Sequence, residues 1–114
     1  MKNLNIAALA GSLFFALAAI NPAQAAVNEV QAKQLIDANK CSKCHSATKT
    51  KSGPSWKKTA AKYKGKADGE KKIIDNITTG PMVKLDDGTK EEHKIIKTKD
   101  PAALKNLAQW ILAH

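Results

Sequence analysis

Cys41-Ser42-Lys43-Cys44-His45 is the most informative stretch of this 114-residue chain. Cys41 and Cys44 are its only cysteines, and their spacing places both sulfurs on one face of a helical turn. His45 follows directly, so that an imidazole nitrogen can reach a metal beside the two sulfurs. The pattern C-x-x-C-H is the attachment motif of c-type haem. It predicts one haem c bound covalently through Cys41 and Cys44, with His45 as an iron ligand.

Two other chemistries could use the same residues. Thiol–disulfide exchange would make Cys41 or Cys44 a nucleophile, but it is typical of a strand–helix context, and we expect no strand before Cys41. A zinc site would need two further ligands, and His45 lies too close to the cysteine pair for the usual zinc spacing. Haem attachment is therefore the favoured interpretation.

The first 25 residues have the pattern of a secretory signal peptide. Lys2 precedes an uncharged, apolar stretch over residues 6–20, which is followed by the small-residue site Ala23-Gln24-Ala25. This stretch is short for a membrane span, which needs about 20 apolar residues. We expect residues 1–25 to be cleaved, residues 26–114 to form one domain, and the protein to be exported, which in a bacterium means the periplasm.

The size and charge of residues 26–114 limit the classes of function that the protein can have. A domain this small buries a modest core and usually needs a cofactor, metal or disulfide for stability, which argues against a self-sufficient enzyme. The formal net charge is +9, or +8 without Lys2, and every basic residue is a lysine. Lysine suits long-range attraction to acidic partners. The predicted compartment excludes nucleic acid, and no basic amphipathic helix favours a membrane surface.

The remaining pattern predicts helices joined by one hairpin. Apolar periodicity and end signals predict helices over about 27–40, 56–64, 70–79 and from Asp100-Pro101 onward. We expect Asn28 to cap the first helix, whose apolar residues are Val27, Val30, Ala32, Leu35, Ile36 and Ala38. The last helix should bury Ala103, Leu104, Leu107, Ala108 and Ile111. Between them, Asp87-Gly88 predicts a two-residue hairpin turn that pairs Met82 with His93.

The chain from residue 26 onward resembles class I c-type cytochromes, closest to the small bacterial c551/c552 or c5-like group. The resemblance rests on a helix that runs into the C-x-x-C-H motif, on Gly53-Pro54, on a central helix pair and on a terminal helix that includes residues 107–111. It implies an all-α class I cytochrome c fold, with about four helices around one covalent haem and a small β-hairpin near the distal side. It also implies that the Pro54 carbonyl orients His45. Trp56 is a candidate to contact a haem propionate or to pack in the core.

The sixth iron ligand has two candidates. Members of this family mostly use methionine, and Met82 is the only methionine after the leader. Met82, however, stands two residues past Gly80, where the third helix ends, whereas the family's ligand lies on the loop that leads into the last helix. His93 lies close to that place. Position favours His93, residue type favours Met82, and we favour His93.

Neither ligand leaves an open position on iron, which favours electron transfer over catalysis. We expect a monomeric electron carrier, not an enzyme, that meets acidic periplasmic or membrane-bound redox proteins through the haem edge and Lys40, Lys43, Lys49 and Lys51. The alternative is a haem-based sensor in which His93 and Met82 exchange as ligands.

Overall fold

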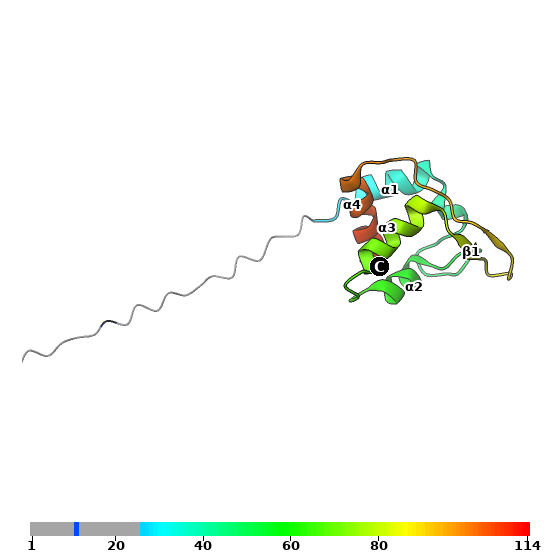
Figure 1. Cartoon of the computed structure of the whole chain (residues 1–114), viewed down its shortest axis with the longest axis horizontal. Coiled ribbons are helices and arrows are strands. Elements are labelled where there is room, and N and C mark those ends of the chain that lie inside the picture. The colour runs from blue at the N-terminus through cyan, green and yellow to red at the C-terminus, as the bar shows by residue number, and fades with distance from the viewer. Residues whose placement is uncertain (1–10, 12–25) are drawn as a thin grey trace, which may run out of the picture.

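The computed structural model describes residue 11 and residues 26–114, so the leader predicted over residues 1–25 lies outside the described residues except for Gly11. In order, the elements are α1 (Glu29–Ala38), the 3-10 turn η1 (Cys41–Lys43), α2 (Trp56–Tyr63), α3 (Gly69–Thr79), β1 (Met82–Lys84), β2 (Lys90–Glu92) and α4 (Pro101–Leu112). Figure 1 shows the hairpin at the end of the domain opposite the crossing of α1 and α4. The all-α fold with one small hairpin is confirmed.

The starts of α1 and α4 are set by the caps that the sequence predicts. The Asn28 side chain accepts a hydrogen bond from the backbone N–H of Gln31 at 3.0 Å. Asp100 accepts one from Ala102 at 3.0 Å, and Pro101 occupies the first position of the helix. Each bond satisfies a backbone N–H that has no partner inside the helix.

Helix α4 lies at the centre of the core and packs against α1, α2 and α3. All five of its predicted apolar residues are buried. The prediction for α1 was wrong in part, because Val27 and Val30 are exposed while Ala32 and Ile36 are buried. Ala32 and Ile36 are four residues apart and share one helix face, whereas Val30 lies about 200° around the helix from Ala32.

The hairpin has a different register from the one predicted. Met82 pairs with Glu92, and the His93 N–H donates to the Pro81 carbonyl oxygen at 2.8 Å. The turn contains three residues rather than two, since Leu85 pairs with Thr89 and Gly88 adopts a φ of 87°. A shift of one residue moves each side chain to the other face of a strand, so Met82 and His93 do not lie side by side.

The tip of the hairpin is joined to the loop that follows the cysteine motif. The Asp86 N–H donates to the Ser52 carbonyl oxygen at 2.9 Å. Each helix in the described part of the chain is too short or too polar to span a bilayer.

Candidate haem site

One cavity of about 1030 Å³ brings the predicted cofactor residues together. Every one of them lines it except Met82: the lining includes Cys41, Cys44, His45, Pro54, Trp56 and His93. The cavity wall also contains apolar side chains from α1, α3, the hairpin and α4, namely Ile36, Ile73, Ile77, Val83, Leu85, Ile96, Leu107 and Ile111. A largely apolar cavity with a few convergent polar groups suits a large, flat hydrophobic cofactor.

His45 is held in place from two directions. Its Nδ1 donates to the Pro54 carbonyl oxygen at 2.6 Å, which leaves Nε2 free to bind a metal. The Trp56 ring stacks on the imidazole with ring centroids 4.6 Å apart. The contact that the resemblance implied for Pro54 is present in the structure.

Gly53 allows the loop to pass close to His45. A Cβ atom at this position would lie 2.8 Å from the Cε1 atom of His45, closer than real Cβ contacts. The Gly53 N–H also donates to the Cys44 carbonyl oxygen at 2.9 Å, which folds the loop back beneath the motif. A side chain at residue 53 would therefore displace the imidazole.

The environment of His45 favours the neutral form of its ring. Burial lowers the pKa of the imidazole, and the nearby His93 and Lys51 act in the same direction, while the bond to Pro54 opposes them. The neutral ring has a free lone pair, the form that binds a metal.

His93 faces His45 across the cavity. The two ring centroids are 6.1 Å apart, and the rings are tilted by 46°. His93 Nδ1 lies 3.0 Å from the Lys94 carbonyl oxygen, so this ring also has its Nε2 left for a metal. Each histidine is thus oriented by a backbone carbonyl.

Met82 lies elsewhere. Its side chain is 62% exposed and does not line the cavity. In the observed register it pairs with Glu92 rather than with His93. The sequence misplaced Met82 because the turn type was assigned from Asp87-Gly88 alone.

Cys41 and Cys44 are both free thiols at the cavity wall. Burial raises the pKa of the Cys41 thiol. A disulfide-exchange nucleophile needs the opposite shift, because the thiolate is the reactive form. In the described residues no group of three or more His, Cys, Asp or Glu side chains could hold a bare metal ion.

The sequence reasoning missed part of the cavity rim. Four further lysines line it, Lys58, Lys62, Lys84 and Lys94. Of the four lysines that were expected to guide docking, Lys40 and Lys43 line the cavity. Lys51 lines a second pocket instead, and its Nζ donates to the Ser42 carbonyl oxygen at 2.6 Å. Lys49 lines neither pocket. Only the fold shows which of the many lysines surround the cavity.

Comparison with known proteins agrees with this geometry. Residues 30–114 match the family model for cytochrome c. The chain belongs to the cytochrome c family. A comparison with curated protein sequences gave no match.

Two solved structures resemble this cytochrome c. The class 1 cytochrome MtoD from Sideroxydans lithotrophicus ES-1 is 52% identical, with a TM-score of 0.73, over 77% of this chain and 97% of that one. Cytochrome c552 from Nitrosomonas europaea is 29% identical, with a TM-score of 0.54, over 70% of this chain and 95% of that one. The fold is that of a small class I c-type cytochrome. Membership of the family implies covalently bound haem c and a role as a haem-based electron carrier that meets redox partner proteins.

Proposed function

We propose that this cytochrome c is a periplasmic electron carrier whose single haem is attached to Cys41 and Cys44 and ligated by His45 and His93. The observation that carries the proposal is the pair of imidazoles that face each other across the cavity, 6.1 Å apart. Both rings have Nδ1 bonded to a backbone carbonyl, which leaves both Nε2 atoms free to bind a metal. The periplasm follows from the leader pattern at residues 1–25.

The spacing of the two rings fits one iron between them. A metal–imidazole bond is about 2 Å long, and the centre of the ring lies about 1 Å beyond the ligating nitrogen, so two such units span roughly 6 Å. Met82 would have to move before it could bind, because its side chain is exposed and does not line the cavity. This argues against the alternative of a sensor that exchanges His93 for Met82.

The ligand set explains why transfer of electrons is favoured over catalysis. The bound haem supplies one-electron exchange at iron. With the iron held by both His45 and His93, a substrate would have no free coordination site. A second imidazole also gives a lower reduction potential than a thioether in the same place.

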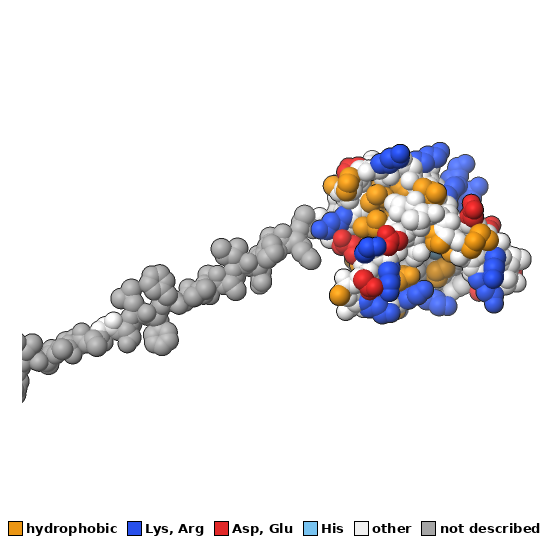
Figure 2. Space-filling model, viewed as in Figure 1, with side chains coloured by type: hydrophobic (Ala, Val, Ile, Leu, Met, Phe, Trp, Pro, Cys, Tyr) orange, Lys and Arg blue, Asp and Glu red, His pale blue; other side chains and the backbone are white. Residues whose placement is uncertain are grey.

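The rim of the cavity indicates the kind of partner. Lys40, Lys43, Lys58, Lys62, Lys84 and Lys94 surround it, against two acidic residues, Glu91 and Glu92. Figure 2 shows lysines along several margins of the face in view. A positive rim attracts acidic redox proteins over long distances, and small transient interfaces release them quickly. We propose that the protein acts as a monomer in such encounters and is not itself an enzyme.

The far-red absorption of the ferric holoprotein tests the ligand set. We expect a low-spin spectrum without a sulfur-to-iron charge-transfer band, unchanged in Met82→Leu and converted to a high-spin spectrum in His93→Ala. A sulfur band that disappears in Met82→Leu would assign the sixth position to Met82 instead. Absence of a covalent haem spectrum, in cells able to attach haem, would overturn the whole proposal.

A further inference from the structure

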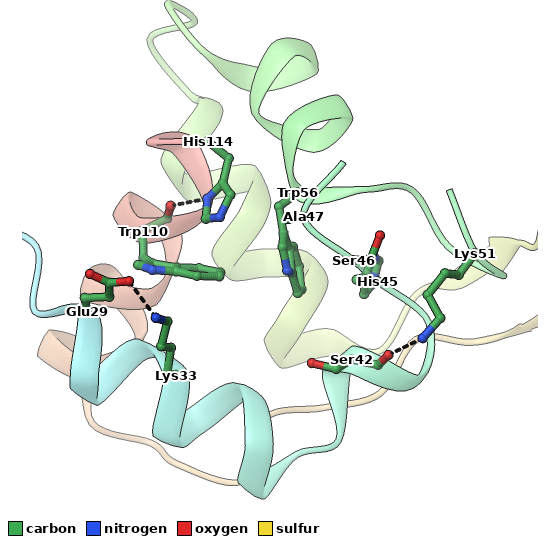
Figure 3. A pocket seen from close by; sticks show the side chains of 10 residues that line it. All are labelled: Glu29, Lys33, Ser42, His45, Ser46, Ala47, Lys51, Trp56, Trp110 and His114. Atoms are coloured by element: carbon green, nitrogen blue, oxygen red, sulfur yellow. Dashed lines mark hydrogen bonds and ion pairs between the residues drawn. The ribbon is translucent and has the colours of Figure 1, made fainter. Parts of the chain in front are cut away.

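A continuous line of aromatic rings leads from His45 to the surface beyond α4. Trp56 stacks on His45 with centroids 4.6 Å apart and planes 27° apart. Trp56 then meets Trp110 edge-on at 5.7 Å, and Trp110 meets His114 edge-on at 4.3 Å. Figure 3 shows the Trp56 ring between His45 and Trp110, with His114 beside Trp110.

The fold fixes each of these rings. Trp56 is the first residue of α2 and is only 8% exposed. Trp110 belongs to α4, the helix that packs against α1, α2 and α3. His114 Nδ1 donates to the Trp110 carbonyl oxygen at 3.0 Å, which places the exposed imidazole over the indole. Aromatic pairs at these distances are in van der Waals contact through their π systems.

We propose that Trp56, Trp110 and His114 form a second electron-transfer route, from the proximal side of the haem to the surface at the end of α4. This inference rests on the proposed haem ligation by His45. One electron passes from an external donor to ferric iron, so that the donor is oxidised and the iron is reduced; no bond or proton is exchanged. The indoles stay uncharged and act as the medium that couples the two sites.

The surface at the end of this route differs in charge from the cavity rim. Here Glu29 and Lys33 pair at 2.7 Å, and both line the same pocket as Trp110 and His114. One further lysine, Lys51, lines this pocket, and its Nζ donates to the Ser42 carbonyl oxygen. None of the rim lysines lines this pocket. The surface therefore fits a redox partner without a strongly acidic face, and electron exchange here should depend less on salt than exchange at the rim.

A ruthenium–bipyridine complex bound to His114 tests the route in the holoprotein. His114 is the one histidine of the three that the proposed ligation leaves free, and its Nε2 is available for the label. Flash photolysis then measures the rate of electron transfer between ruthenium and iron. We expect Trp110→Leu to slow this rate severalfold and Trp110→Phe to leave it near the wild-type value, because Phe keeps an aromatic ring in place.

A crossed control separates the route from a general effect of the substitution. In a His114→Gln, Lys105→His background the label sits on an exposed position of α4 outside the aromatic line. There Trp110→Leu should leave the rate unchanged. If Trp110→Leu has no effect at His114 either, while the haem spectrum and potential stay normal, the route is wrong and the proposed function stands.

A second readout does not depend on electron transfer. Ring-current shifts of the Trp56 and His114 proton resonances should move in Trp110→Leu, since Trp110 contacts both rings. Resonances that do not move would show that the rings are not in contact in solution, and this would also overturn the route. A chain without the spectrum of covalent haem would instead contradict the proposed function.

Discussion

Gly53 shows how tightly single residues define the site. Its backbone passes beneath His45, and the next residue, Pro54, holds the imidazole through its carbonyl oxygen. Cys41, Cys44, His45 and Pro54 could all be placed from sequence, because a short motif and its loop are local in the chain. His93 was harder to place, since it reaches the cavity only through the register of a hairpin that starts at residue 82.

Gly53→Ala should damage the site without touching a ligand. The added Cβ would lie 2.8 Å from His45 Cε1, so either the loop or the imidazole must move. We expect the holoprotein to lose about 1–3 kcal/mol of unfolding free energy, as for overpacking elsewhere. Denaturant unfolding followed at the haem absorption band measures this. Lys49→Ala, in the same loop but exposed, should have little effect; equal stability of the two variants would contradict the argument.

At the scale of elements, helix starts were predictable and the strand register was not. A helix start needs only a capping side chain and the residues directly after it, as at Asn28 and Asp100. The register of the hairpin depends on whether its turn holds two residues or three. In the three-residue turn, the Asp86 N–H donates to the Ser52 carbonyl oxygen. The sequence of the hairpin itself does not predict this contact.

The cap of α4 provides a test at this scale. Asp100→Ala removes the bond to the Ala102 N–H and should lower the unfolding free energy by about 1 kcal/mol. Asp68, at the start of α3, makes no side-chain capping bond, and its ion pair with Lys72 is exposed. Asp68→Ala should therefore lower the unfolding free energy less than Asp100→Ala does. Denaturant titration of both variants compares them, and a larger loss in Asp68→Ala would contradict the capping argument.

At the scale of the whole molecule, the positions of the lysines matter more for docking than the total net charge does. The net charge of +9 was evident from the sequence, but which lysines surround the cavity depends on how the helices and hairpin are packed. Lys84 is the last residue of β1, and Lys94 follows β2. Both line the cavity although they lie far from the cysteine motif in sequence. A count of charges therefore predicts an acidic partner, but it does not show which lysines lie at the rim of the cavity.

Rim lysines should control the rate of exchange with anions. Electron exchange between the holoprotein and hexacyanoferrate should slow as ionic strength rises, because salt screens the attraction. Replacing Lys43 and Lys94 together with Gln should lower the rate at low salt and flatten its salt dependence. Lys105→Gln removes an exposed lysine away from the cavity and serves as the control. Stopped-flow rates with the same salt dependence in both variants would contradict docking at the rim.

The bond from the Asp86 N–H to the Ser52 carbonyl ties the hairpin that carries His93 to the loop that orients His45. The two histidine-bearing segments are thus joined directly to each other, which restricts the movement of one relative to the other. If both imidazoles hold the iron, as proposed, this link would keep the distance between them nearly constant when the charge on iron changes by one. The reorganisation energy of each electron transfer is then low, because few atoms must move before the electron can pass.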